Sequence, residues 1–291
     1  MQSTGGAMQG ILKAGQVRQG SFYASAGPGG GPTVWDRLAG VDPVHAAVSA
    51  ADEAAEAQKS AAVVELLARE LPDGVVADLG CGYGRIAKYL LPRRSFAGYV
   101  GVDGSATMLT LFDRRYRERP AEQRTPLLLL KSGIDRLPVE DASLDAVFSC
   151  AVLLHNPKTG TRAAVAEIFR VLKPGGKVVI VDSFPSRSSL QGLFGSAYQL
   201  AYALRGRGES NGPVRYFTRG EVERMFSAFG DVRVAPAGLV TIPKSYPFLG
   251  ARLNAAYRRA VYAPVDRGLR RILPEGAARV SPQFYNVVAR K

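Results

Sequence analysis

Residues 75–84, VVADLGCGYG, join a short apolar run to an acidic turn that is dense in glycine. The apolar residues are typical of a parallel strand buried on both faces. Asp78 places a carboxylate at the end of that strand. Three alternating glycines, Gly80, Gly82 and Gly84, allow the backbone to bend sharply and to touch a ligand directly. Because Arg85 begins the helical stretch RIAKYLL, strand, turn and helix together predict a nucleotide-type pocket.

The spacing of this turn argues against a dinucleotide. The pyrophosphate fingerprint is G-x-G-x-x-G, whereas the order here is G-C-G-Y-G, with an acid two residues before the first glycine. An acid there repels phosphate and favours a ligand with a positive amino group. The turn resembles the first motif of the class I S-adenosylmethionine (SAM) methyltransferases. That resemblance implies that SAM is the cofactor and that its amino-acid end lies against Asp78, Gly80, Cys81 and Gly82.

A second apolar strand, YVGVD, ends in Asp103 about twenty residues after the turn. A carboxylate at that distance can accept hydrogen bonds from both ribose hydroxyls, and the resemblance assigns Asp103 and Gly104 to SAM. The alternative is that Asp103 serves only as a helix N-cap. Met108, one turn into the following helix, lies either under the adenine or in the core.

A third stretch, LPVEDASLDAVFSC, is similar to the loop and fourth strand of ubiquinone and menaquinone C-methyltransferases. Cys150 ends this strand and is expected beside the cofactor. That family places an acid where Gly133 stands, to bind the adenine amino group. Here the backbone of Gly133 and Ile134 is expected to make this contact, unless Asp135 substitutes for the acid.

A fourth element, EIFRVLKPGGKVVIVD, reads as a helix, a turn and a fifth buried strand. The four elements cover about residues 75–182 in the family's order. The resemblance implies an α/β fold with a Rossmann-like sheet of seven strands, the last antiparallel, helices on both faces, and helical insertions that cover the acceptor site.

Composition restricts the class of protein. The chain has 291 residues, 46% of them hydrophobic, which is ample for a core. No run of eighteen apolar residues occurs, and no signal segment is seen at the N-terminus, so we expect a cytoplasmic protein. The two cysteines are expected to be reduced packing residues. With only two histidines, no zinc site can be assembled and no metal is expected.

The composition of the first 34 residues differs from that of the rest of the chain and suggests a domain boundary there. Residues 1–34 are rich in Gly, Ser, Gln and Ala and are expected to be a flexible segment, followed by a methyltransferase domain over 35–291. Aromatic residues ahead of the first helix fold over SAM in this family. Tyr23 and Trp35 are therefore candidates for a lid, or else they anchor the segment on the core.

Two insertions interrupt the expected core. Residues 183–218 follow the fifth strand, where the family builds its acceptor cover, and Phe194, Tyr198 and Tyr202 are candidates to line an apolar acceptor pocket. The alternative is a helix merely packed on the sheet. Residues 240–282 separate the last two strands and are expected to form one or two basic amphipathic helices broken near Pro264.

Most of the positive charge lies near the C-terminus. Residues 205–291 hold 16 Lys and Arg against 6 Asp and Glu, out of a net charge of +13. Three interpretations of the helices within 244–275 stay open: contact with an anionic membrane surface, attraction of an anionic or lipid-linked acceptor, or charges that only face water. No nucleic-acid partner is expected, because no DNA or RNA module is recognised.

His155 is the best candidate for a catalytic base, since it follows the fourth strand at the edge where ligands bind in open α/β sheets. The alternative is that it orders its loop. The sequence predicts a methyltransferase that transfers a methyl group from SAM to a small-molecule or lipid-like acceptor, in secondary or isoprenoid-type metabolism. A peripheral membrane methyltransferase and a SAM-binding protein without activity are the alternatives. Nothing in the sequence indicates the methylated atom or the oligomeric state.

Overall fold

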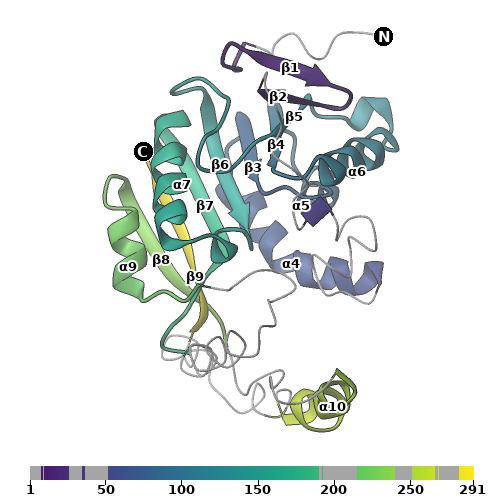
Figure 1. Cartoon of the computed structure of the whole chain (residues 1–291), viewed down its shortest axis with the longest axis vertical. Helices are drawn as coiled ribbons and strands as arrows, with labels where there is room; N and C mark the ends of the chain where they lie inside the picture. Colours follow the sequence, from purple (N-terminus) through teal and green to yellow (C-terminus); the bar gives the residue numbers. More distant parts are fainter. Residues whose placement is uncertain are drawn as a thin grey trace.

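The computed structural model describes residues 8, 10–25, 35–36, 52–189, 192, 215–239, 251–265, 268 and 282–291. Nine strands of these residues form one mixed sheet in the spatial order β1-β2-β5-β4-β3-β6-β7-β9-β8 (Figure 1). The strands are β1 (Gln16–Gln19), β2 (Phe22–Ser25), β3 (Val75–Leu79), β4 (Gly98–Asp103), β5 (Leu127–Lys131), β6 (Leu144–Cys150), β7 (Leu172–Pro185), β8 (Gly230–Leu239) and β9 (Pro282–Arg290).

The helices alternate with the strands over the central part of the chain. The α-helices are α4 (Glu53–Glu70), α5 (Arg85–Leu90), α6 (Ala106–Arg117), α7 (Lys158–Val171), α9 (Arg219–Met225) and α10 (Ala251–Tyr257). Short 3-10 helices are η1 (Ala121–Gln123) and η2 (Leu153–His155), and η3 (Arg258–Tyr262) is a π-helix. Among the described residues, no helix is both long enough and apolar enough to cross a membrane.

The centre of the sheet is a doubly wound parallel arrangement. β3 pairs in parallel with β4 on one side and with β6 on the other, and β5 and β7 extend the parallel order outward. The last strand, β9, lies antiparallel between β7 and β8. These observations confirm the Rossmann-like α/β fold and the antiparallel last strand. The expected number of strands was wrong, because the sheet has nine strands rather than seven.

The two additional strands come from the segment that the sequence places among flexible residues. β1 and β2 form an antiparallel hairpin in which Gln19 faces Phe22, and β2 continues the sheet by pairing in parallel with β5. Gly20, at φ 61°, supplies the left-handed conformation that this tight turn requires. Phe22 and Ala24 are buried against the sheet core. The glycine-rich composition suggested flexibility, but these two apolar residues give the hairpin a buried face.

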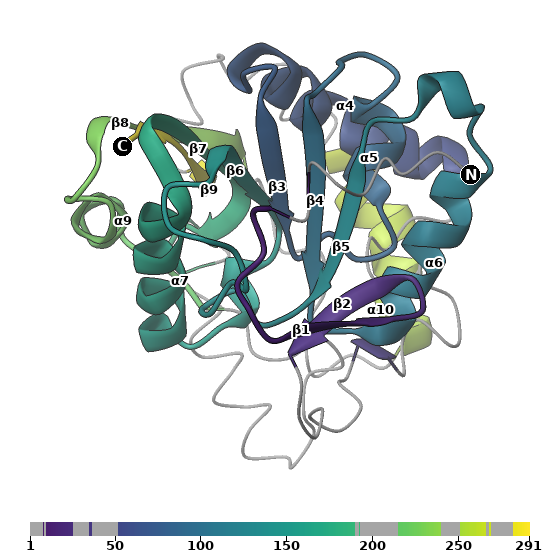
Figure 2. The ribbon, with the colours of Figure 1, turned by 90° about the horizontal axis from the view of Figure 1, so that it is seen from above.

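Apolar side chains alternate between the two faces of the sheet and fill two cores. On one face, α4, α5 and α6 pack against residues such as Val76, Tyr99 and Phe148. On the other, α7 and α9 pack against residues such as Ala77 and Val147. Figure 2 shows these two groups of helices on opposite sides of the sheet. The expectation of helices on both faces is therefore confirmed.

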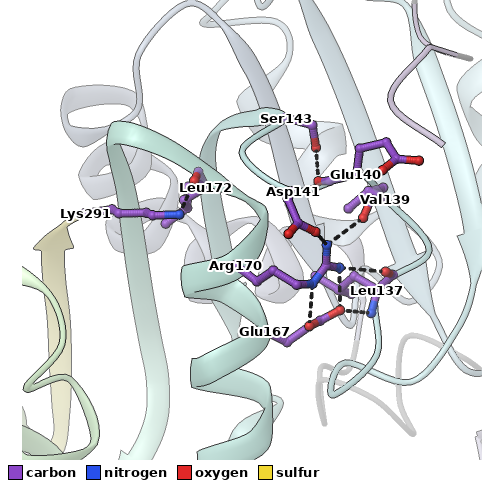
Figure 3. Close-up of polar contacts among 9 residues, drawn as sticks. All are labelled: Leu137, Val139, Glu140, Asp141, Ser143, Glu167, Arg170, Leu172 and Lys291. Carbon is purple, nitrogen blue, oxygen red and sulfur yellow. Dashed lines mark hydrogen bonds and ion pairs between the residues drawn. The ribbon is translucent and has the colours of Figure 1, made fainter. Parts of the chain in front are cut away.

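A network of polar contacts fixes the loop between β5 and β6 to α7 (Figure 3). Arg170 donates to the carbonyls of Leu137 and Val139, both at 3.0 Å, and pairs with the carboxylates of Glu167 and Asp141. Glu167 in turn accepts from the Leu137 backbone N–H at 2.6 Å. Because the guanidinium satisfies two loop carbonyls and two carboxylates, it holds the loop that follows Gly133 and Ile134 against the body of the protein.

Both predicted insertions lie mostly outside the described residues. The acceptor-pocket candidates Phe194, Tyr198 and Tyr202 are among those outside, so their roles stay predictions. Within 240–282, α10 continues directly into the π-helix η3, and residues 263–265 are again helical. Pro264 itself lies in a helical stretch, and because residues 266 and 267 lie outside the described part of the chain, the expected break near Pro264 stays a prediction. The wider π turn just before Pro264 offers a physical reason for its helical position, since it relieves the clash of a proline ring with the preceding turn.

Candidate functional site

The glycine turn leaves β3 between the carboxyl ends of β4 and β6. The backbone N–H groups of Gly80 and Cys81 both donate to the Val102 carbonyl of β4, at 2.8 and 3.0 Å. Gly80, Gly82 and Gly84 have φ values of 72°, 54° and 82°, which L side chains rarely adopt. Behind the turn a Cβ on Gly84 would lie 2.5 Å from the Phe112 ring, whereas a Cβ on Gly82 would meet nothing within 4 Å. The turn is thus packed on one side and open on the other.

Asp103, at the end of β4, bonds directly to this turn. Its Oδ2 accepts from the Gly82 N–H at 2.9 Å, and its Oδ1 accepts from the Ser105 N–H at 2.8 Å. Burial raises the pKa of this carboxyl, and the two backbone hydrogen bonds partly oppose the shift. Each oxygen keeps a further lone pair, so the carboxylate can still accept two hydrogen bonds from a ligand. The helix N-cap is Ser105, whose hydroxyl accepts from the Met108 N–H.

Asp78 lies beneath the turn rather than on its open side. Its side chain belongs to a residue that is only 2% exposed, and Oδ2 accepts from the Tyr99 hydroxyl at 2.7 Å. Burial raises the pKa of Asp78 to about 7, while the Tyr99 hydrogen bond and the nearby Arg85 cation oppose that rise. The structure therefore brings Asp78 and Asp103 to the same turn, but Asp78 is buried, whereas Asp103 is half-buried and bonds to Gly82, where an added Cβ would meet no atom within 4 Å.

Cys81 lies within the turn and Cys150 ends β6, and both are free, buried thiols. Burial raises the pKa of Cys81 well above its usual value and that of Cys150 to about 11, so both are protonated at neutral pH. Cys150 Sγ accepts from the Arg85 guanidinium at 3.4 Å, and the same guanidinium donates to Ser60 Oγ at 3.0 Å. Among the described residues, no group of three or more His, Cys, Asp and Glu side chains could hold a metal ion.

The remaining predicted cofactor residues fall into two groups. Gly104 and Gly133 are exposed, and Ile134 is half-buried against the core, so these three lie at the surface of the same sheet edge. Ser132 joins this edge to β4, because its N–H donates to the Asp103 carbonyl at 3.1 Å. Met108, by contrast, is buried and packs with Tyr83. This packing accounts for Met108 as a core residue, and its place under the adenine stays a prediction.

Trp35 and the neighbouring Asp36 cross over the glycine turn. Trp35 makes an edge-to-face contact with His155 in η2, after β6, with ring centroids 5.5 Å apart. Asp36 Oδ1 accepts from the Ser105 hydroxyl at 2.6 Å and from the Thr107 N–H, at the start of α6 after β4. Because β3 lies between β4 and β6, this pair spans the end of β3 where the turn lies. Tyr23 is in β2 and packs against the core, so the structure does not bring it together with Trp35.

Sequence reasoning missed the polar groups of α4 that face the turn. Glu56, buried in α4, accepts hydrogen bonds from the Tyr83 and Tyr89 hydroxyls at 2.7 and 2.9 Å. Ser60, one turn further along, receives the Arg85 guanidinium. No spacing within the sequence reveals these contacts, because each joins residues that are 25 or more positions apart.

The residues around the glycine turn have the hydrogen-bonding groups and the charge that SAM requires. The carboxylate of Asp103 retains acceptor capacity for ribose hydroxyls, and the open side of Gly82 leaves room for a ligand to approach the backbone. Cationic groups of a ligand are favoured by the carboxylates of Asp36 and Asp103 near this edge, whereas a pyrophosphate would be repelled. Asp103, Gly82, Gly104 and the loop at Gly133 and Ile134 would hold the cofactor.

Comparison with known proteins gives the same assignment. Residues 77–180 match the family model described as a methyltransferase domain. A demethylmenaquinone methyltransferase of Deinococcus radiodurans is 35% identical over 127 residues, which are 44% of this chain and 49% of that protein. A demethylmenaquinone methyltransferase of Thermus thermophilus is 32% identical over 48% of this chain and 59% of its own length.

A third relative is named for a different acceptor. The dimethylglycine N-methyltransferase of Parasynechococcus marenigrum is 32% identical over 164 residues, which are 55% of this chain and 56% of that protein. The chain therefore spans about half the length of the curated relatives named here. The part of the chain that matches the family model, residues 77–180, includes the glycine turn, Asp103 and Cys150.

Solved structures agree on the fold. A putative methyltransferase of Bacillus halodurans has a TM-score of 0.51 and 15% identity, covering 80% of this chain and 99% of that one. A phosphoethanolamine N-methyltransferase of Haemonchus contortus, bound to phosphomonomethylethanolamine and S-adenosylhomocysteine, has a TM-score of 0.50 and 17% identity, covering 80% and 53%. At these identities the likeness concerns the arrangement of the sheet and helices alone.

Proposed function

We propose that this protein transfers a methyl group from SAM to a small-molecule or lipid-like acceptor. The proposal starts from residues 77–180, which form a methyltransferase domain of the class I SAM-dependent type that is similar to quinone methyltransferases. The observation that carries the proposal is the Asp103 carboxylate. It accepts hydrogen bonds from the Gly82 N–H of the glycine turn and from the Ser105 N–H at the start of α6, and an added Cβ on Gly82 would meet no atom within 4 Å.

The experiment for this proposal has two stages. Isothermal titration with SAM tests for binding, and release of S-adenosylhomocysteine in the presence of cell extract tests for transfer. Binding with release supports the enzyme. Binding without release in any extract favours the alternative of a SAM-binding protein without activity, and absence of binding contradicts both.

Methyl transfer depends more on the alignment of the two reactants than on acid or base catalysis. When bound, SAM supplies a methyl group on a positively charged sulfur, which an acceptor nucleophile attacks from the opposite side. Asp103 and the glycine turn fix the position of one reactant, and most of the acceleration would come from holding the two reactants in line. Two of the named relatives carry demethylmenaquinone in their names and one carries dimethylglycine, which supports an acceptor of low molecular mass.

Trp35 and His155 are proposed to close the site over both reactants. Their ring contact joins the segment ahead of α4 to the loop after β6, so the pair lies at the edge where an acceptor must enter. We further propose that His155 removes the acceptor's proton where the nucleophile carries one. The role of Tyr23 in a lid stays a prediction.

A matched pair of variants tests these two roles. Trp35→Leu is expected to weaken SAM binding about 3- to 10-fold, because the side chain that covers the site loses its aromatic contact. His155→Gln is expected to change SAM affinity by less than about 3-fold while slowing release of S-adenosylhomocysteine by about 10²-fold or more. Titration and the release assay, run on the same preparations, give both values. Equal effects of the two variants on SAM affinity would contradict the division of roles.

A specific observation favours a membrane-associated form of the same activity. The exposed side chains of Leu253, Val261 and Val265, at 61%, 44% and 39% exposure, belong to the helical stretch of α10 and η3 and the residues that follow it. Arg252 and Arg259 of the same stretch are also exposed. Apolar residues accompanied by arginines are typical of helices that rest on an anionic bilayer surface. We propose that residues 244–275 include such a contact, through which a lipid-like acceptor is reached.

Vesicle sedimentation measures this contact. The full chain is expected to sediment with vesicles that contain phosphatidylglycerol, and much less with pure phosphatidylcholine, because the arginines need anionic headgroups. The double variant Leu253→Ser, Val261→Ser is expected to lose about 10-fold or more of the binding, since two apolar contacts are removed. Val17→Ser, in the distant hairpin, is the control and should bind as the original chain does. Undiminished sedimentation of the double variant would sink the membrane proposal and leave methyl transfer untouched.

A further inference from the structure

Arg85 is a partly buried cation for which the described residues supply no carboxylate partner. As the first residue of α5, it sends its guanidinium toward α4 and the end of β6, where it donates to Ser60 Oγ at 3.0 Å and to Cys150 Sγ at 3.4 Å. Both acceptors are neutral, because one is a hydroxyl and the other a thiol. In the described part of the chain no carboxylate lies within ion-pair distance of Arg85.

An arginine carries five N–H donors in one plane, and the described contacts use only two of them. Withdrawing a guanidinium from water without an anionic partner is costly, so an arrangement of this kind is unfavourable unless something else interacts with the remaining donors. The carboxylates of Asp78 and Asp182 act on Arg85 only at longer range. The free donors therefore leave capacity for one more anionic group.

The position of Arg85 says which end of a ligand it would meet. β4 and β6 flank β3, so the glycine turn at the end of β3 has Asp103 on its β4 side and Cys150 on its β6 side. Arg85 contacts Cys150 and so lies on the side away from Asp103. A ligand whose ribose is held by Asp103 and which crosses the turn would bring its opposite end to Arg85. In SAM, that end is a free amino acid.

We propose that Arg85 binds the carboxylate of the amino-acid end of SAM and makes the site selective for ligands that carry this carboxylate. The inference rests on the proposed function. Arginine and carboxylate match as a planar, two-point, charge-assisted pair. Ser60 and Cys150 act as positioning residues: the Ser60 hydroxyl donates to the Glu56 carbonyl at 2.8 Å, which leaves its lone pair aimed at the guanidinium.

A purely structural role for Arg85 makes a different prediction. If the guanidinium only balanced the charges of Asp78 and Asp182, its loss would weaken the whole site, and ligands with and without a carboxylate would suffer alike. The test must therefore remove the carboxylate from the ligand as well as the guanidinium from the protein, in the manner of a double-mutant cycle.

Four ligands provide that cycle: SAM, S-adenosylhomocysteine, decarboxylated SAM and 5′-methylthioadenosine, each titrated calorimetrically into the full chain. The original protein is expected to bind SAM about 10- to 100-fold more tightly than decarboxylated SAM, as one charge-assisted pair allows. Arg85→Gln is expected to lose about that factor for SAM and S-adenosylhomocysteine, but less than about 3-fold for the two ligands without a carboxylate. Arg85→Lys should fall between, because it keeps the charge and loses the planar fork.

Arg219→Gln is the matched control, since this exposed arginine pairs, among the residues that the structure describes, only with Glu223 on α9. It should leave all four affinities unchanged. Equal binding of SAM and decarboxylated SAM by the original protein would overturn the inference without any variant, even if Arg85→Gln failed to fold. So would an equal loss for all four ligands in Arg85→Gln. Binding of none of the four by the original protein would instead refute the proposed function, which separates the two failures.

Discussion

Replacing Asp103 by alanine is expected to weaken SAM binding by about 1–3 kcal/mol, or roughly 5- to 150-fold in dissociation constant. Two causes act together. The variant loses the acceptor proposed for the ribose hydroxyls, and it also releases the Gly82 and Ser105 N–H groups that the carboxylate holds. The second loss loosens the open side of the turn itself, so the effect on binding should exceed that of removing one ligand contact alone.

The measurement is calorimetric titration at a temperature where circular dichroism shows the variant to be folded. The control is Glu122→Gln, which removes a charge from an exposed residue of η1. That variant should bind SAM as the original chain does. If Asp103→Ala bound SAM with unaltered affinity, the site would have to be placed elsewhere.

A pair of glycine variants should separate folding from binding within the same turn. Gly84→Ala is expected to lower the free energy of unfolding by about 2–4 kcal/mol, because its φ is 82° and its Cβ would lie 2.5 Å from the ring of buried Phe112. Gly82→Ala should cost only about 1–2 kcal/mol, the penalty of a left-handed residue, since its Cβ would meet no atom within 4 Å.

The two variants should act in the opposite order on the ligand. The methyl group of Gly82→Ala would occupy the open side of the turn, where SAM is proposed to approach, so SAM affinity should fall about 10-fold or more. Urea unfolding gives the first quantity and titration the second. A folded Gly82→Ala protein that binds SAM normally would show that ligand and backbone do not meet there.

The central sheet was predictable because its signals are local. Buried apolar runs such as Val75–Leu79 and Gly98–Asp103 end in acids or glycines, and their order along the chain fixes a parallel core. The β1–β2 hairpin was not predictable from composition. Its strands are four residues each, and their stability depends on pairing with β5, which is about a hundred residues away in the sequence.

The residues of the candidate site also fall into those that a local motif predicts and those that it does not. Asp103 and the glycine turn could be identified because the motif carries them at a fixed spacing. Asp36, Ser60 and the buried Glu56 could not, since each is an isolated polar residue whose partner comes from a distant element. Trp35 was a candidate for the lid from its place ahead of the first helix, but only the structure pairs it with His155. The sequence thus indicates which cofactor is expected, and the tertiary contacts support the proposal that Asp103 and Arg85 bind its opposite ends.

Competitive calorimetry on the unmodified chain shows whether the glycine turn and Asp103 form a SAM site. SAM, NAD and ATP are each titrated into the protein, alone and in the presence of S-adenosylhomocysteine. We expect saturable binding of SAM that S-adenosylhomocysteine suppresses, and no binding of the two phosphate-bearing ligands. Saturable binding of NAD or ATP that is lost in Asp103→Ala, with none for SAM, would contradict this expectation.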